Sequence, residues 1–77
     1  MKYRAVNFDG IPFGNGKEPY VADAIEDLAY YIAYYWHRCS VALQMLDSEG
    51  KWAIAPYDLQ NAFHKELDFR FSSFEHK

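Results

Sequence analysis

The chain has 77 residues, 19% of them aromatic, and its 11 acidic and 8 basic residues give a formal net charge of −3. A chain this short buries only about 60% of the surface that its unfolded form exposes, which favours one small domain with a thin core. The acidic balance, with both signs interspersed, argues against general nucleic-acid binding, because that function needs a basic stripe on the protein.

The first half of the chain predicts a strand, a glycine-rich loop and a long helix. Residues 2–8 alternate in the manner of a strand. Residues 9–18 form the glycine-rich loop, whose glycines suit turns. Pro19 suits a first helical turn, and a helix is expected over about residues 20–38. One side of this helix is apolar and is expected to cover a sheet: Val21, Ala24, Ile25, Leu28, Ile32, Tyr35 and Trp36.

The second half of the chain predicts a hairpin, a short helix and a final strand. Apolar runs flank Asp47–Gly50, which has turn composition, so the hairpin is expected over about residues 40–57. Beyond Pro56, apolar residues at helical spacing predict a short helix over about residues 58–66. Residues 67–71 alternate and predict an edge strand. The hairpin side chains expected to face the core are Val41, Leu43, Met45, Trp52 and Ile54.

These elements predict an α+β fold in a single domain over residues 1–77. The order β-α-β-β-α-β is the split βαβ pattern of ferredoxin-like folds. The alternative is a three-stranded antiparallel sheet packed by one long helix. Neither arrangement includes a membrane span, because the uncharged stretch Leu28–Trp36 is far shorter than the roughly 20 residues that a span needs.

The cysteine content favours a reducing compartment. Cys39 is the only cysteine, so the chain cannot form an internal disulfide. The first residues also lack the apolar run of a secretory signal. We therefore expect a cytoplasmic protein.

The Gly-Lys pair in the loop does not match a nucleotide-binding motif. A phosphate-binding loop requires a glycine five residues before Gly16 and a hydroxyl residue after Lys17. The chain has Ile11 and Glu18 at those two positions. The dinucleotide-binding pattern fails as well, because it requires a third glycine that does not follow. We interpret the loop as a connector and expect no cofactor.

The candidates for catalytic or metal-binding chemistry are too few to form a site. His37 and Cys39 lie two residues apart, but a metal needs three or four ligands. His64 and His76 do not extend this pair into a recognisable series. A Cys–His nucleophile would also need an orienting third group. We expect a buried or half-buried Cys39, no metal and no enzymatic activity.

The outer side of the long helix is a candidate binding surface. Tyr30 and Tyr34 lie about one turn apart and off the apolar side, and the first half of this outer side is acidic. Small residues beside the tyrosines favour a helix face that another protein covers. These small residues are Ala22, Ala29 and Ala33.

The leading hypothesis is a non-catalytic protein-binding module, monomeric or homodimeric, that acts by occupying a partner's surface. Its acidic residues would meet a basic surface, and its aromatic residues would be anchors. In size and composition alone, the chain is similar to inhibitors and modulators carried by phages and other mobile elements, including anti-CRISPR proteins. The expected binding residues are Tyr30, Tyr34, Trp52, Asp23, Glu26, Asp27 and Glu49.

Two other classes of function stay open at this point. The first is a nucleic-acid-binding sheet similar in topology to RNA-recognition domains, with Tyr3, Trp52 or Tyr57 stacking on bases. Residues 51–57 lack the Gly-aromatic core of the motif in such domains, and the net charge disfavours this function. The second is a small oligomeric enzyme with its site between subunits.

Overall fold

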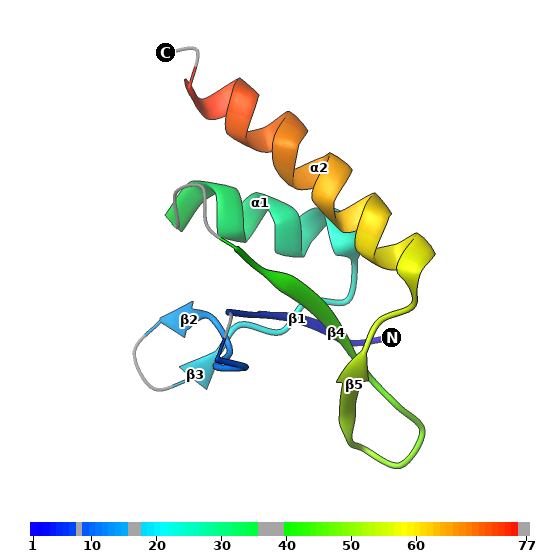
Figure 1. Ribbon diagram of the computed structural model, residues 1–77. Coiled ribbons are helices and arrows are strands. Elements are labelled where there is room, and N and C mark those ends of the chain that lie inside the picture. The colour runs from blue at the N-terminus through cyan, green and yellow to red at the C-terminus, as the bar shows by residue number, and fades with distance from the viewer. Residues whose placement is uncertain (8, 16–17, 36–39, 76–77) are drawn as a thin grey trace.

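The computed structural model describes residues 1–7, 9–15, 18–35 and 40–75, and it shows a small α+β fold (Figure 1). A three-stranded antiparallel sheet with the order β1-β4-β5 carries the two helices on one side. This confirms the α+β class and the three-stranded sheet of the second expected arrangement, with two helices on the sheet in place of one. A separate two-stranded sheet pairs β2 with β3. The elements in chain order are β1 (Tyr3–Val6), β2 (Gly14–Asn15), β3 (Glu18–Pro19), α1 (Ile25–Tyr35), β4 (Ala42–Leu46), β5 (Trp52–Ile54) and α2 (Tyr57–Glu75).

The three-stranded sheet has one covered face and one open face. Its central strand, β4, places Leu43 opposite Ala5, and it places Gln44 opposite both Arg4 and Ile54. Side chains alternate along a strand, so these two rows lie on opposite faces. Leu43 is fully buried beneath the helices, whereas Ile54 is 73% exposed. The open face is defined here by five residues of the strands: Arg4, Gln44, Leu46, Trp52 and Ile54.

The core lies between the covered face and the two helices. Phe63, Leu67 and Phe71 of α2 are buried and follow one another at four-residue spacing, so they form a line along that helix. This line packs with buried residues of α1 and of the strands. The other members of the core are Ala5, Ala22, Leu28, Ala29, Tyr31, Ile32, Ala33, Val41, Leu43 and Ala55.

One side chain of α2 completes the hydrogen bonding of the central strand. The amide of Gln60 donates to the backbone carbonyl of Leu43 over 2.6 Å and to that of Ala55 over 3.3 Å. Its oxygen accepts from the backbone N–H of Leu43 over 2.9 Å. Buried backbone groups need such partners, so Gln60 ties α2 to the sheet at the point where β5 ends.

The last segment of the chain is helical, so the expected edge strand over residues 67–71 is wrong. α2 continues without a break over Tyr57–Glu75, well beyond the short helix that the sequence predicted. Leu67 and Phe71 extend the buried line that Phe63 begins, and the residue midway between them faces solvent. Packing against α1 at helical spacing outweighs a brief alternation of apolar residues.

α1 is shorter than the sequence suggested, and its buried side is rotated. Pro19 belongs to β3, the helix begins at Ile25, and residues 36–38 of the expected helix lie outside the described residues. Tyr31 is buried, whereas Tyr35, which was expected on the apolar side, is 56% exposed. The prediction assumed a helix that covers only a sheet. α1 also packs against α2, and a helix with two neighbours buries a wider arc.

The glycine-rich segment connects β1 to α1 through the β2–β3 hairpin. Gly10 has a φ of 77°, a conformation that suits glycine. Gly14 lies so close to the backbone of Glu18 that a Cβ atom would collide with it. Because α1 begins only at Ile25, the segment does not lead from a strand directly into a helix N-terminus, which is the setting of a phosphate-binding loop. Gly16 and Lys17 lie outside the described residues.

The hairpin places Trp52 and Ile54 on the open face, so their expected place in the core is wrong. Leu46 pairs with Trp52, and Gln44 pairs with Ile54. Val41 and Leu43 are buried as expected, and Met45 packs partly buried against the core.

The difference comes from the length of the turn. Asp47 donates its backbone N–H to the carbonyl of Lys51 over 2.8 Å, so the pair closes a three-residue loop. The Asp47 side chain accepts from the N–H groups of Glu49 and Lys51, and Gly50 has a φ of 79°. The sequence suggested the four-residue loop Asp47–Gly50. A shift of one residue moves every side chain of a strand to the other face.

Candidate interaction surfaces

Exposed aromatic side chains gather where the second half of α1 meets α2. Tyr30, Tyr34 and Tyr35 are 47%, 57% and 56% exposed. The rings of Tyr30 and Tyr34 are stacked with centroids 6.2 Å apart, and the ring of Tyr35 meets Tyr34 edge-on at 4.9 Å. From α2, the guanidinium carbon of Arg70 lies 5.5 Å from the ring centroids of Tyr30 and of Phe69, which is 62% exposed. We call these five residues the tyrosine patch.

One buried tyrosine and one partly buried tyrosine support the tyrosine patch from the core side. Tyr35 contacts the buried Tyr31 with ring centroids 4.9 Å apart. Tyr31 in turn stacks in parallel on Tyr20, with centroids 3.9 Å apart. Burial raises the pKa of the Tyr31 phenol, and the neighbouring Tyr35 and Tyr20 add to this effect. The exposed rings are therefore anchored to the core, which lowers the entropy lost when they contact another molecule.

The positive charge in the tyrosine patch already has a partner. Nε of Arg70 donates to a carboxylate oxygen of Glu66, one helical turn earlier, over 3.0 Å. This pair holds the guanidinium beside the ring of Tyr30, where a cation is attracted to the ring face. The surface of the tyrosine patch is therefore aromatic in character, and its one cation is paired with a carboxylate.

The acidic residues expected to bind a partner lie at the other end of α1. Glu26 and Asp27 are exposed in its first turn, where carboxylates interact favourably with the helix dipole. Asp23 forms an ion pair with Nζ of Lys2 at 2.6 Å. The hydrogen bond and the charge of Lys2 hold the pKa of the Asp23 carboxyl below its usual range. At a rise of about 1.5 Å per residue, Glu26 in this acidic turn lies roughly 12 Å from Tyr34 along the helix axis.

The alanines beside the tyrosines do not form an exposed face. Ala22, Ala29 and Ala33 are all buried in the core of the chain. The inference that small residues here await another protein is therefore wrong. Ala29 and Ala33 lie on α1, where their small side chains allow neighbouring elements to pack closely against the helix.

Trp52 and Glu49, the remaining expected binding residues, lie away from the tyrosine patch. Glu49 is exposed at the tip of the β4–β5 hairpin. Trp52 is half-buried on the open face, and the guanidinium carbon of Arg4 lies 4.6 Å from its ring centroid. Nε of Arg4 also donates to Oε1 of Gln44 over 2.8 Å. Arg4 and Gln44 were not among the expected binding residues, because 40 positions separate them and the sequence does not show which strands pair.

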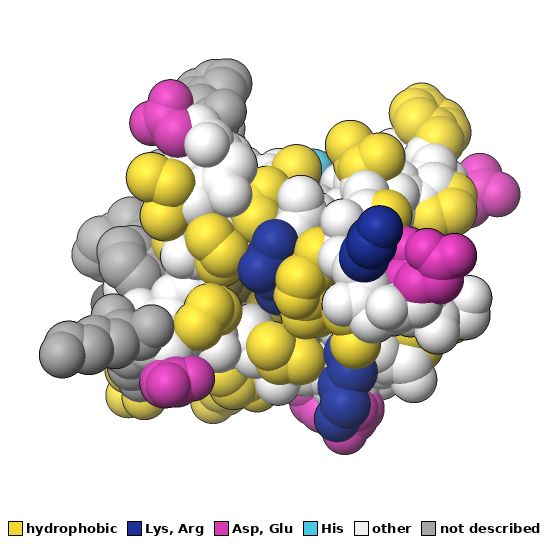
Figure 2. Space-filling view, turned by 90° about the horizontal axis from the view of Figure 1, so that it is seen from below, with side chains coloured by type: hydrophobic (Ala, Val, Ile, Leu, Met, Phe, Trp, Pro, Cys, Tyr) yellow, Lys and Arg dark blue, Asp and Glu magenta, His cyan; other side chains and the backbone are white. Residues whose placement is uncertain are grey.

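Figure 2 views the side of the molecule opposite the helices, where the open face lies. Hydrophobic side chains spread across this view, basic side chains lie among them, and acidic side chains lie toward the periphery. Tyr3, which was expected to stack on bases, instead packs against the core on the covered side. Tyr57 is 77% exposed, but it lies at the start of α2. The three aromatic residues proposed for base stacking therefore do not share one surface.

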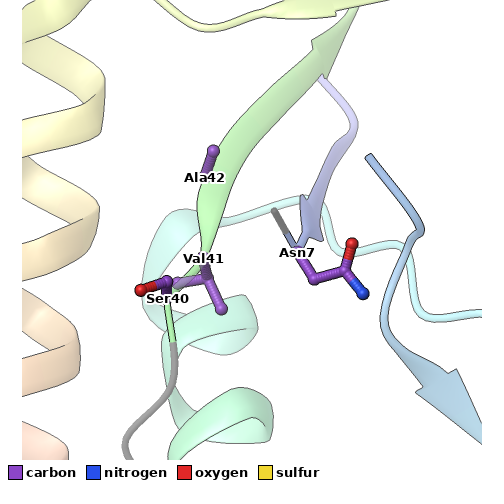
Figure 3. Close-up of a pocket in the computed structure, with 4 residues that line it drawn as sticks. All are labelled: Asn7, Ser40, Val41 and Ala42. Atoms are coloured by element: carbon purple, nitrogen blue, oxygen red, sulfur yellow. The ribbon is translucent and has the colours of Figure 1, made fainter. Parts of the chain in front are cut away.

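A pocket of about 250 Å³ lies between the end of β1 and the start of β4. Figure 3 shows that the Asn7 side chain points away from the β4 side of this pocket. Its oxygen accepts hydrogen bonds from the backbone N–H groups of Asp9 and Ile11, so it stabilises the turn after β1. No convergent set of reactive groups forms among the described lining residues, which are Asn7, Ser40, Val41 and Ala42.

Other sites considered from the sequence can be placed only in part. His37 and Cys39, like Lys17, lie outside the described residues. Over the part of the chain that the structure describes, His, Cys, Asp and Glu side chains do not gather in threes at a place where a metal ion could bind. In the same residues, neither helix has the length and apolar content to cross a membrane.

Comparisons with protein-family models, with curated proteins and with solved structures find no match to this chain.

Proposed function

We propose that this chain is a non-catalytic protein-binding module that acts by occupying a partner's surface, with the tyrosine patch as its main contact. The observation that carries the proposal is the set of neighbouring, half-exposed tyrosine rings on α1, which contact one another and Arg70 of α2. Tyrosine and arginine are enriched among the residues that dominate binding energy at protein interfaces.

The rigidity of the tyrosine patch supports this assignment. Tyr35 rests on Tyr31, and Tyr31 rests on Tyr20, so the patch is continuous with the core. A patch held in this way loses little conformational freedom when a partner covers it. Large exposed apolar areas of this kind typically mark interaction sites on soluble domains.

The partner that best fits this surface presents an apolar contact with a basic rim. Glu26 and Asp27 would meet that rim beyond the N-terminal end of the tyrosine patch. A small module of this kind would serve as an inhibitor or modulator. Phages and other mobile elements carry many inhibitors and modulators of similar size and composition. A second copy of the chain is an alternative partner for the same patch.

The test compares the wild type with the double variant Tyr30→Ser/Tyr34→Ser. Exposed substitutions shift the free energy of unfolding by about 0.5 kcal/mol or less, so the variant should remain folded. Buried interface aromatics can each contribute about 2 kcal/mol or more, so capture of a partner should fall by at least about 30-fold. Sedimentation measures self-association, and pull-down from a host that carries candidate targets measures binding of a foreign partner.

The control is Tyr57→Ser, which removes an exposed tyrosine outside the patch. It should leave both self-association and partner capture unchanged. If the double variant folds and binds as the wild type does, the tyrosine patch is not the contact. Turnover of a small molecule by the purified wild-type chain would contradict the non-catalytic assignment.

A further inference from the structure

The open face of the sheet carries positive charge, although the protein as a whole is acidic. The side chains that alternation assigns to this side of β1, β4 and β5 include no Asp or Glu. Lys2 directly precedes β1, on the same side of the strand as Arg4, and its charge is paired with that of Asp23. Arg4 is different, because it forms no ion pair with any carboxylate in the described part of the chain. Arg4 is thus a positive charge without a counterion on this face.

Two neighbours fix the position of the Arg4 guanidinium. It lies over the ring of Trp52, with 4.6 Å between the guanidinium carbon and the ring centroid. Its Nε donates to Oε1 of Gln44 over 2.8 Å. Arginine has no hydrogen-bond acceptor, so this contact requires the oxygen of the Gln44 amide and leaves the amide nitrogen free to donate elsewhere.

The groups that remain on this cluster are all hydrogen-bond donors. They are the two terminal nitrogens of Arg4, the amide nitrogen of Gln44 and the indole N–H of Trp52. Among the described residues, none of these groups has a further hydrogen bond. A fixed guanidinium fork beside other donors matches the geometry of a carboxylate, which can accept two parallel hydrogen bonds.

The surroundings of the cluster are apolar. Leu46 and Trp52 are half-buried, and Ile54, directly opposite Gln44 in the sheet, is 73% exposed. Figure 2 shows hydrophobic side chains on both sides of the basic groups in this view. A ligand for this face would therefore combine one negative group with apolar neighbours.

We propose that the open face is a second interaction surface, which binds a protein segment through one carboxylate held by Arg4 and through apolar side chains packed on Trp52 and Ile54. A protein segment fits better than a nucleic acid, because binding a phosphate backbone requires several cations and this face offers one that is unpaired. This surface lies opposite the helices, so it is distinct from the tyrosine patch and does not depend on the function proposed for that patch.

The test uses two short peptides that differ only in charge. The probes are acetyl-Leu-Glu-Leu-amide and acetyl-Leu-Gln-Leu-amide, added to the full chain while NMR records the Trp52 indole N–H and the Arg4 Nε–H signals. The glutamyl peptide should shift both signals in a saturable manner. The glutaminyl peptide should bind about tenfold more weakly, because hydrogen bonds to an ionised acceptor are roughly twice as strong as neutral ones.

Three variants separate recognition from folding. Arg4→Gln should abolish the preference for the glutamyl peptide, whereas Lys65→Gln, which removes an exposed cation on α2, should preserve it. Gln44→Glu places a carboxylate within reach of the Arg4 guanidinium. This variant should remain folded and lose the response to the glutamyl peptide. It therefore tests carboxylate recognition by Arg4 even if Arg4→Gln does not fold.

Several results would overturn the proposal. One is an equal response to the two peptides, which would show that charge is not recognised. Another is a peptide response that persists in Gln44→Glu. A third is that a thymidine oligonucleotide shifts the two signals and the glutamyl peptide does not, which would assign the face to nucleic acid. The absence of any response to the glutamyl peptide at millimolar concentration would also exclude it.

Discussion

Leu43 and Gln44 are neighbours on β4, yet they lie on opposite faces of the sheet. Leu43 is fully buried with the helices, and its backbone N–H and carbonyl both bond to Gln60 of α2. Gln44 lies on the open face, where its oxygen accepts from Arg4. The covered face is filled by apolar side chains, whereas the open face keeps polar groups in fixed positions.

This difference shows how a small domain can bury a core on one face of a sheet and hold polar side chains in fixed positions on the other. The covered face fixes the strands, and the strands then present Arg4 and Trp52 to solvent in a defined geometry. On the open face, contacts between cross-strand neighbours stabilise the positions of the side chains. Changes on the two faces should therefore have different consequences, which the following substitutions test in order of expected effect.

Leu43→Ala should cause the largest loss of stability. Removing a fully buried leucine side chain costs about 2–5 kcal/mol, because apolar contacts are lost and a cavity remains. Urea unfolding followed by circular dichroism measures the change. The matched control is Ile54→Ala on the open face, which should change stability by about 0.5 kcal/mol or less. Equal losses in the two variants would mean that the two faces are not distinct in the way described above.

Gln60→Ala should cause the second largest loss. It removes three hydrogen bonds to the backbone and leaves the buried N–H of Leu43 without a partner, which costs about 1–3 kcal/mol. The same unfolding assay applies, with Asn61→Ala, the exposed neighbour on α2, as control. If Gln60→Ala is as stable as the control, water replaces the amide and α2 is not tied to the sheet by this residue.

Much of the fold could be predicted from local patterns in the sequence. The centre of α1, the β4–β5 hairpin and the first strand all appear near their expected places. The C-terminal half of α2 did not follow from the sequence, because Leu67 and Phe71 fit both a strand alternation and the four-residue spacing from Phe63. Only the presence of α1 beside it decides between these two patterns.

The candidate sites were harder to predict, because they depend on register and on contacts between distant residues. The four-residue turn that the sequence suggested, which is one residue longer than the observed turn, would have placed Trp52 on the same face as Leu43. The exposure of Tyr30 and Tyr34 could be inferred from helical spacing, and the structure confirms it. The contact of Tyr30 with Arg70 required knowledge of how the two helices pack.

Gly50→Ala should have a smaller effect and tests the turn that sets the two faces. A Cβ atom at this position meets nothing within 4 Å, so the cost arises only from the φ of 79°, at about 1–2 kcal/mol. Gly50→Asn should cost less, because asparagine tolerates this region better. Thermal unfolding of both variants measures the difference. Equal stability of the wild type and Gly50→Ala would show that the turn adopts another conformation.

The smallest effect is expected for Tyr31→Phe, which makes the covered side more uniformly apolar. Among the described residues, the buried Tyr31 hydroxyl has no hydrogen-bond partner, so its removal should leave stability unchanged or raise it by up to about 1 kcal/mol at neutral pH. Burial raises the pKa of this phenol, so the unfolded chain ionises before the folded one, and wild-type stability should fall as the pH rises above 10. Tyr31→Phe lacks this contribution, so its stability relative to the wild type should increase with pH. Unfolding midpoints at neutral and alkaline pH measure both effects, and a loss as large as that of Leu43→Ala would mean that the hydroxyl has a stabilising partner after all.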